Sequence, residues 1–388
     1  MTIVKSGVQY SGRWNLQAQA QAEGASTWPS PPPLQQLFAW GRGSSGALGD
    51  GTTTNKSSPI QIGALTDWET TWMGGEYGGG IKTDGTLWMW GSNSQASLGT
   101  GNTTSYSSPV QIGALTNWLT GVAGNYHCAA IKTDGTLWTW GRGAYGALGD
   151  GTTVAKSSPI QVGALTDWLN VSCGYQFTLA INTSGKLYAW GYNGFGYLGL
   201  GNTTNYSSPV QVGALTTWAD VSCGQAHVLA TTTSNTLFAW GYNQQGQLGI
   251  GTGGAYTHKS SPVQVPATNW SKIYAGNRSS LATRTDGTLW SWGKNDVGQL
   301  GIGDTTNYSV PMQIGGLTTW NKIGGGYQHR YATNTSDALY IWGDNGFGQL
   351  GDGTTTSKSS PTQVGALTGW TILGRGNFSN SSQVIFYA

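Results

Sequence analysis

The chain has 388 residues and a formal net charge of +2, with only 9% of its residues charged. This balance, with no basic stripe, argues against nucleic acid as a partner. The sequence lacks an apolar run of 18 residues and a secretion signal, so we expect neither membrane insertion nor export. Its 63 glycines, 20 tryptophans and 18 tyrosines favour short strands joined by tight turns over helices, because glycine costs a helix interior roughly 1 kcal/mol relative to alanine.

Residues 1–36 differ in composition from the rest of the chain. Residues 30–33 read Ser-Pro-Pro-Pro, which is typical of an extended, semi-rigid spacer. Tyr10, Trp14 and Trp28 argue against simple disorder, since disordered arms are poor in aromatic residues. We expect an N-terminal anchoring arm with a proline-rich linker that orders when it docks to another protein. The alternative is a disordered tail.

From residue 37 onward the sequence repeats with a period of about 50 residues. The dipeptide Trp-Gly marks each copy, and its tryptophans are Trp40, Trp90, Trp140, Trp190, Trp240, Trp292 and Trp342. A second tryptophan keeps the same interval, at Trp68, Trp118, Trp168, Trp218, Trp270, Trp320 and Trp370. Such self-similarity is the signature of a repeat architecture.

One copy, residues 157–199, contains four predicted strands. Residues 157–165 include Pro159 and are expected to form an edge strand, where proline is tolerated. Strands are expected at 168–174, 177–182 and 187–190, and the turn before the last is Asp-Gly in other copies, a strong hairpin signal. Sheets this small cannot bury both faces alone. Radial packing of seven of them predicts an all-β fold, a seven-bladed β-propeller of four-stranded antiparallel blades.

The two ends of the repeat region predict how the ring closes. The final copy stops before the strand that would carry Leu-x-x-Trp-Gly, and the first repeat-like element in the chain is residues 37–41, Leu-Phe-Ala-Trp-Gly. We therefore expect strand 37–41 to pair with the C-terminal blade. Closure of this kind removes two exposed sheet edges. The predicted domains are the arm, 1–36, and the propeller, 37–388.

The repeat motif resembles that of a known family. Residues 221–230 read Val-Ser-Cys-Gly-Gln-Ala-His-Val-Leu-Ala, and residues 237–249 read Leu-Phe-Ala-Trp-Gly-Tyr-Asn-Gln-Gln-Gly-Gln-Leu-Gly. This pattern is similar to the regulator-of-chromosome-condensation repeat, and the resemblance covers residues 37–388. It implies a seven-bladed propeller. It does not carry over the nucleotide-exchange activity of the founding member on chromatin, because no basic arm precedes the propeller here.

The leader carries a second, shorter resemblance. Residues 7–16, Gly-Val-Gln-Tyr-Ser-Gly-Arg-Trp-Asn-Leu, followed by Gln-Ala-rich sequence and Thr27-Trp28-Pro29, resemble leader segments of structural proteins from tailed phages of cyanobacteria and marine bacteria. The resemblance implies a virion protein that is anchored through residues 1–36.

Few residues are suited to catalysis or to metal binding. His127, His227 and His329 occupy one repeat position that accepts Phe177 in another copy, so we interpret them as packing residues. Cys128, Cys173 and Cys223 are expected as small buried side chains, with metal ligation as the minor alternative. One aspartate per loop is too little for calcium. The sequence predicts no cofactor, no metal and no enzymatic activity.

Recognition is expected in the loops after each Trp-Gly, which vary most between copies. Their aromatic residues suit a sugar or a protein, although solvated loops remain the alternative. The candidate recognition residues are Tyr145, Tyr192, Phe195, Tyr197, Phe347 and, in an inserted loop, His258. Lysine and tyrosine also alternate three residues before each repeat proline, for which duplication of a two-blade unit and a docking rim are both possible explanations.

These observations lead to three hypotheses about function. The first is a non-enzymatic structural protein of a tailed-phage virion, a fibre, decoration or neck appendage assembled in the host cytoplasm. It would bind other virion proteins through residues 1–36 and a host glycan or protein through its propeller loops. The second is a cellular propeller scaffold or regulator, including a nucleotide-exchange factor for a GTPase. The third, a glycan-acting enzyme, would require paired carboxylates that the sequence does not supply.

Overall fold

The computed structural model describes residues 2–5, 8–11, 35–64, 66–254, 257–374, 376 and 378–387. The chain divides into two units, Met1–Leu34 and Gln35–Ala388. In the first unit β1 (Thr2–Lys5) pairs antiparallel with β2 (Val8–Ser11). Tyr10 lies in β2, but its side chain, like Trp14 and Trp28, falls outside the described part of the chain. The anchoring role expected of these three residues therefore stays a prediction.

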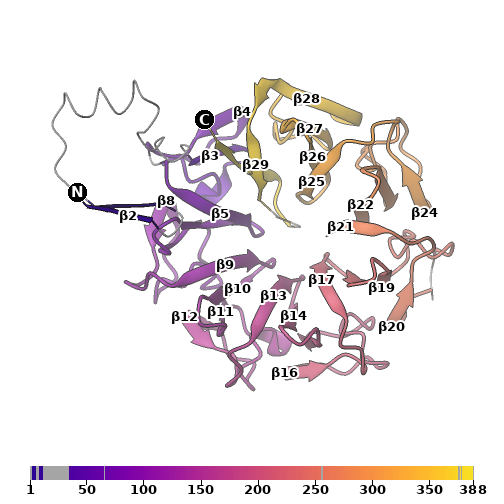
Figure 1. The fold of residues 1–388 in the computed structure, drawn as a ribbon, viewed down its shortest axis with the longest axis horizontal. Helices are drawn as coiled ribbons and strands as arrows, with labels where there is room; N and C mark the ends of the chain where they lie inside the picture. The colour runs from indigo at the N-terminus through magenta and orange to yellow at the C-terminus, as the bar shows by residue number, and fades with distance from the viewer. Residues whose placement is uncertain are drawn as a thin grey trace. The chain divides into compact units, whose positions relative to one another are not determined.

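The second unit is a propeller of seven four-stranded antiparallel sheets around a central axis (Figure 1). Blades 1 to 3 comprise β5 (Trp68–Met73), β6 (Tyr77–Lys82), β7 (Leu87–Gly91) and β8 (Tyr106–Gln111); β9 (Trp118–Ala123), β10 (His127–Lys132), β11 (Leu137–Gly141) and β12 (Lys156–Gln161); and β13 (Trp168–Cys173), β14 (Phe177–Asn182), β15 (Leu187–Gly191) and β16 (Tyr206–Gln211).

Blades 4 to 7 continue the ring in chain order. They comprise β17 (Trp218–Cys223), β18 (His227–Thr232), β19 (Leu237–Gly241) and β20 (Lys259–Gln264); β21 (Trp270–Ala275), β22 (Ser279–Arg284), β23 (Leu289–Gly293) and β24 (Tyr308–Gln313); β25 (Trp320–Gly325), β26 (His329–Asn334), β27 (Ala338–Gly343) and β28 (Lys358–Thr368); and β29 (Trp370–Leu373), β30 (Ser381–Tyr387), β3 (Gln35–Gly41) and β4 (Lys56–Gln61). Two short 3-10 turns, Ser44–Gly46 and Ala144–Gly146, lie in loops, and no helix in the described residues is long and apolar enough to cross a membrane.

Each blade begins at the second tryptophan and ends with the proline-containing strand. The sequence analysis placed the proline strand first in its blade, and this grouping was wrong. In blade 3, for example, β16 pairs with β15, with Tyr188 opposite Gln211. The proline strand follows the Trp-Gly strand through a long hairpin loop, and only afterwards does the chain cross to the next blade. The expectation of an edge strand is confirmed, because this strand is the outermost of each sheet.

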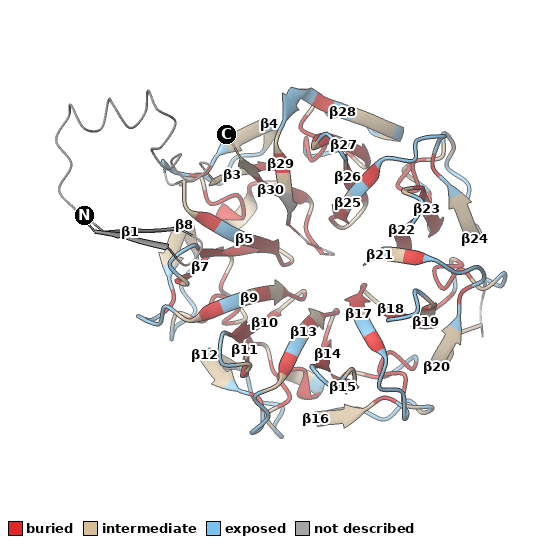
Figure 2. Cartoon of the chain, viewed as in Figure 1, coloured by how far each residue is buried: buried red, intermediate tan, exposed pale blue. Residues whose placement is uncertain are grey.

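The ring closes through the predicted pairing of the two ends. Strand β3 pairs antiparallel with β30 along its whole length, from Gln35 opposite Tyr387 to Gly41 opposite Ser381. Because the proline strand belongs to the preceding blade, blade 7 takes two strands from each end of the repeat region. Buried residues follow the strands, and exposed residues gather in the loops at the periphery (Figure 2).

Every Trp-Gly tryptophan forms the same hydrogen bond between blades. Its indole Nε1 donates to a backbone carbonyl in the long loop of the preceding blade, over 2.9–3.1 Å, and its side chain is fully buried. The seven pairs are Trp40 with Gln349, Trp90 with Ala47, Trp140 with Ser97, Trp190 with Ala147, Trp240 with Tyr197, Trp292 with Gln247 and Trp342 with Gln299. The bond from Trp40 lies at the closure and is equivalent to the other six.

A glycine in the preceding loop makes room for each of these indoles. Gly199 has φ +72°, and a Cβ at this position would lie 2.8 Å from Trp240 Nε1. The second tryptophan of each blade packs at an angle against the first, with Trp218 and Trp240 6.1 Å apart between ring centroids. Unlike Trp240, Trp218 is buried with no partner for its indole N–H among the described residues. A comparison of the two tryptophans therefore separates the contribution of packing from that of the indole hydrogen bond.

We expect Trp240→Phe to destabilise the propeller more than Trp218→Phe. Both substitutions remove similar ring volume from the interface between blades. Only the first leaves a buried carbonyl, that of Tyr197, without its donor, and an unsatisfied buried acceptor costs about 1–3 kcal/mol. Urea unfolding of the two variants measures the difference in the free energy of unfolding. Equal losses would show that the indole hydrogen bond contributes no net stability.

Candidate interaction surface

Two sets of loops emerge on the same face of the propeller. Because strands alternate in direction, the loop between the first and second strands of a blade and the loop between its third and fourth strands lie at the same end of the sheet. In blade 3 these are residues 174–176 and 192–205. We call this side the long-loop face. It holds all six loop residues that the sequence predicted for recognition.

Five of those six residues belong to one cluster of rings, in which Tyr197 lies 5.7 Å from Tyr192 and 6.0 Å from Phe195 between ring centroids. Tyr145 and Tyr192, from the long loops of blades 2 and 3, lie 4.7 Å apart between ring centroids. Phe195 lies edge-on, 5.2 Å from Tyr242 and 5.0 Å from His258. Tyr242 stacks on His258 at 4.6 Å. Side chains from three successive blades therefore form a continuous aromatic surface, with Phe195 and Tyr145 well exposed.

This surface surrounds a pocket of about 310 Å³. We call it the aromatic pocket; its lining is mostly apolar and consists of Tyr175, Tyr192, Phe195, Tyr197, Gln225, Ala226, Tyr242 and Arg278. Tyr197, predicted as a surface residue, is only 6% exposed. It stacks on Phe177 with ring centroids 5.3 Å apart, and burial raises the pKa of its hydroxyl. Tyr197 therefore supports the pocket from within and is not part of the outer surface.

The remaining predicted residue, Phe347, lies in blade 6 and does not line the pocket. The Arg42 guanidinium of blade 7 lies over its ring at 5.3 Å. Arg42 in turn forms an ion pair with Glu76, with 3.2 Å between Nη2 and the carboxylate. This sector of the long-loop face therefore has an aromatic ring beside a neutralised arginine.

Sequence analysis missed Tyr175, Gln225 and Arg278, which come from the short loops near the central axis. Tyr175 lies 5.7 Å from Tyr126 and 6.1 Å from Phe378 between ring centroids. These short loops differ from copy to copy as much as the long ones do, reading Gly-Tyr-Gln, Gly-Gln-Ala and Gly-Asn-Arg in blades 3 to 5. This variation between copies is the sequence signal that could have identified Tyr175, Gln225 and Arg278.

Buried asparagines hold the long loops in place. The Asn193 side chain accepts a hydrogen bond from the Leu198 N–H and donates to the carbonyls of Asn202 and Thr204. Asn243 does the same with Leu248 and Thr252 in blade 4, and its backbone N–H donates to Nδ1 of His258. The inserted loop of blade 4 is thus tied to the loop core through His258. The aromatic rings stand on a preorganised support.

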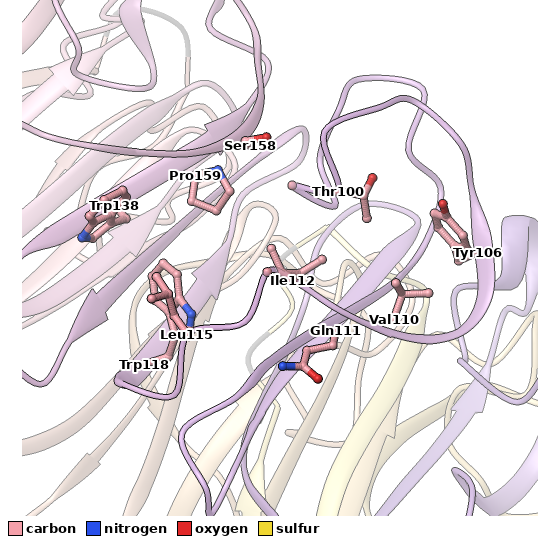
Figure 3. Close-up of a pocket in the computed structure, with 12 residues that line it drawn as sticks. Thr100, Tyr106, Val110, Gln111, Ile112, Leu115, Trp118, Trp138, Ser158 and Pro159 are labelled. Atoms are coloured by element: carbon pink, nitrogen blue, oxygen red, sulfur yellow. The ribbon is translucent and has the colours of Figure 1, made fainter.

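The rim of the propeller holds a larger recess that has a simpler origin. A cavity of about 400 Å³ lies between blades 1 and 2, and its lining includes Ile112, Leu115, Trp118, Trp138 and Pro159 (Figure 3). The equivalent residues Ile314, Leu317, Trp320, Tyr340 and Pro361 form a similar cavity of about 300 Å³ at blade 6. Because it recurs with the repeat, this recess follows from how neighbouring blades pack.

Comparison with known proteins agrees with this geometry. The RCC1-like domain matches residues 114–381, and the Regulator of chromosome condensation (RCC1) repeat matches 36–73 and 84–131. The chain belongs to the family of RCC1-like domains.

Similar proteins cover the propeller in structure but little of it in sequence. Human WBSCR16 superimposes with a TM-score of 0.82 over 91% of this chain and 99% of its own at 20% identity. Yeast RCC1 (Prp20), solved bound to Kap60, gives 0.81 over 92% and 89%, also at 20% identity. Protein RCC2 homolog of Danio rerio is 58% identical over 38 residues, 10% of this chain and 8% of that protein. The chain thus matches only a small part of this curated relative.

Three of the four histidines of this RCC1-like propeller are packing residues in the structure. His127, His227 and His329 are buried, and Nε2 of each lies 2.9 Å from a hydroxyl of the next blade, on Thr178, Ser280 and Ser382 respectively. Burial lowers the pKa of His127 to about 4. Burial, assisted by the Arg330 charge, lowers the pKa of His227 and His329 to about 3.

Arg330 is fully buried and forms the hydrogen bonds that a tyrosine, Tyr77, forms at another blade interface. Its Nη1 donates to the carbonyls of Gly326 and His329, over 2.8 and 2.6 Å. Between blades 1 and 2 the equivalent carbonyls, of Gly124 and His127, accept from the Tyr77 hydroxyl. Blade 5 has the small Ser279 where blade 1 has Tyr77, and Arg330 fills that space and donates to the Ser279 hydroxyl. The guanidinium of Arg330 is therefore held within the interface between blades 5 and 6.

Several other titratable groups are paired within loops or buried. Lys56, Lys156 and Lys358 form ion pairs with Asp50, Asp150 and Asp352 of their own loops, 3.2–3.7 Å apart. Tyr308 donates to Asp304 in the same way, so pairing within loops accounts for several of the alternating lysines and tyrosines. The three cysteines are buried thiols. Among the described residues no group of three or more His, Cys, Asp or Glu could hold a metal ion.

We expect the stability of the propeller to fall between pH 6.5 and 5. The three buried histidines have folded-state pKa values below the unfolded value near 6.5. Their contribution is present above pH 6.5 and is lost as pH falls toward the folded values, at up to roughly 1.4 kcal/mol per pH unit for each histidine. Urea unfolding at pH 7.5 and pH 5 measures this loss.

Replacement of one histidine tests the assignment. His227→Phe, which places at this position the residue type found at 177, should reduce the pH dependence by about one third. His258→Gln, at a half-exposed site, should leave most of it. An unchanged pH dependence in His227→Phe would contradict the assignment.

Proposed function

We propose that this RCC1-like propeller is a non-catalytic interaction protein that binds a protein partner on its long-loop face. The observation that carries the proposal is the aromatic pocket, where three blades converge on an exposed surface of tyrosine, phenylalanine and arginine. Tyrosine and arginine are enriched in the energetically important centres of protein interfaces. Loops rich in tyrosine, glycine and asparagine on a rigid β-scaffold have the composition of antibody recognition loops.

The chemistry of the lining supports binding over catalysis. The residues of the aromatic pocket include two ionisable types only, tyrosine and arginine, with His258 stacked beside Tyr242. Glycoside hydrolysis would need two carboxyl groups a few ångströms apart, and the described lining contains none. Without a base and a nucleophile within reach of each other, a binding role accounts best for the site.

Regulation of a GTPase is the narrower form of this proposal. Prp20p of Saccharomyces cerevisiae, which has a similar fold, was studied for its binding to Gsp1p and histones. At 20% identity this likeness concerns the fold alone, so the proposal for this chain rests on the pocket. Nucleotide release from a purified Gsp1p-type GTPase, with and without the propeller, tests the narrower form directly.

We expect a tagged propeller to co-purify from its native extract with a stoichiometric protein partner. Tyr192→Ser with Phe195→Ser should lose that partner, because the two rings supply exposed walls of the pocket. The matched control is Leu115→Ser with Leu317→Ser. It removes exposed apolar side chains from the loops that connect one blade to the next, away from the long-loop face. Quantitative mass spectrometry compares the three samples. Retention of the partner by the double pocket variant would contradict the proposal.

The virion assignment remains a proposal that depends on residues 1–36. It is supported by the resemblance of the leader to phage structural proteins and by the aromatic residues within it. We expect a chain that lacks residues 1–34 to fold as a propeller, since β3 begins at Gln35, and to be absent from purified particles. Incorporation of the truncated protein into particles would show that the leader is not the anchor.

A further inference from the structure

We propose that the aromatic pocket accepts an acidic protein segment, with one large apolar side chain seated between the rings and carboxylates bound by Arg278 and Arg142. This inference rests on the proposed interaction function and specifies the chemistry of the partner. It follows from three features of the long-loop face: the size of the pocket, the arrangement of the arginines near it, and the absence of acidic residues from the loops that line it.

The size of the pocket suits a single anchor side chain. Its volume of about 310 Å³ lies at the lower limit of small-molecule sites, which hold about 300–1,000 Å³. Tyr192, Phe195 and Tyr242 line it, with Phe195 edge-on to Tyr242, and the buried Tyr197 contacts both Tyr192 and Phe195. Aromatic rings held at these angles offer an apolar recess for an aromatic or aliphatic side chain, the usual seat of an interface hot spot.

Arg278 carries a charge that no carboxylate neutralises among the described residues. Its Nε lies 3.4 Å from Gln225 Oε1, which also accepts a hydrogen bond from the Asn277 side chain over 3.1 Å. The guanidinium lies 5.7 Å from the centre of the Tyr242 ring. A neutral amide and an aromatic face therefore position this arginine at the pocket without cancelling its charge.

Arg142 repeats this arrangement on the other side of Tyr175. Its guanidinium lies 5.3 Å from the centre of the Tyr126 ring; burial raises the pKa of Tyr175, and the Arg142 charge opposes this rise. Within the described part of the chain it forms no ion pair. Arg42, by contrast, occupies the equivalent position in blade 7 and is paired with Glu76. Arg142 is thus distinguished from its counterpart by the lack of a carboxylate, and Arg278, in a short loop of blade 5, is likewise without one among the described residues.

The loops that line the pocket supply no negative charge of their own, and Asp150, in the loop that carries Arg142, is paired with Lys156. The long loops 192–205 and 242–258 contain neither aspartate nor glutamate, and neither do the short loops 174–176, 224–226 and 276–278. In a protein of net charge +2, this sector is therefore locally positive. Arginine binds carboxylates through charge-assisted hydrogen bonds, which strengthen where an apolar partner excludes water. An acidic segment with an apolar anchor complements both properties.

The inference can be tested with displayed peptides. A library of random 12-residue peptides is selected on the wild-type protein, and the most enriched peptide is measured by fluorescence anisotropy. We expect aspartate or glutamate on both sides of a tryptophan, phenylalanine or leucine. Arg142→Gln with Arg278→Gln should raise Kd about tenfold or more. For the wild-type protein, Kd should rise with added salt, because salt screens the attraction between the arginines and the peptide carboxylates. Phe195→Ser should weaken both this peptide and its Asn/Gln analogue.

The matched control lies on the same face. Arg42→Gln and Phe347→Ser alter the paired arginine and its ring in blades 6 and 7, and should leave Kd unchanged; urea unfolding verifies that every variant is folded. Enrichment of neutral peptides, or equal binding by the double arginine variant, would overturn the acidic specificity while the co-purification experiment still decides the proposed function. Binding of neutral oligosaccharides on a glycan array, without peptide enrichment, would overturn the inference in favour of a sugar site.

Discussion

The hydrogen bond from each Trp-Gly indole to a loop carbonyl of the preceding blade is the interaction on which this propeller depends. It is formed seven times, including at the closure, where Trp40 from the first repeat strand reaches Gln349 near the end of the chain. Each bond fixes two things together: the orientation of a blade against its neighbour and the base of a long loop. A glycine must precede it, since a side chain at Gly199 would collide with the indole of Trp240. The tryptophan and glycine of the repeat motif are therefore explained by this contact between blades more than by the formation of the strands.

A ring held in this way leaves its loops free to differ. The side chains of Asn193 and Asn243 form hydrogen bonds with the inner backbone carbonyls of their loops. The outer loop positions therefore contribute little to holding the loop in place. Tyr192, Phe195 and Tyr242 can gather there without disturbing the blades. The same tolerance operates between blades, where Tyr77 in one interface and Arg330 in another donate to equivalent carbonyls. The residues proposed to bind a partner therefore lie at positions that the packing of the blades does not require.

The sequence was sufficient for the fold because the fold is local and repeated. Tryptophan spacing predicted seven blades, and the missing final strand predicted pairing of residues 37–41 with the C-terminal blade, as found. The blade boundary was misplaced because the order of strands along the chain does not say which neighbour the proline strand pairs with. The pocket was only half predictable. Tyr192, Phe195 and His258 lie in visibly variable loops, whereas Tyr175 and Arg278 join them only because the ring brings the loops of blades 3 and 5 to one site. Tyr197 looked exposed in sequence, and only its stacking on Phe177 shows that it is buried.

What distinguishes one sector of the ring from another is charge rather than shape. Arg42, Arg142 and Arg278 all stand beside aromatic rings on the same face, at distances of 5.3–5.7 Å. Glu76 neutralises the first, and no described carboxylate reaches the other two. An unpaired arginine near an apolar recess is costly to desolvate unless a ligand supplies the opposite charge. A single acidic residue in one short loop is therefore enough to make equivalent positions of a symmetric frame unequal, and the sector that lacks it is the one in which the rings converge.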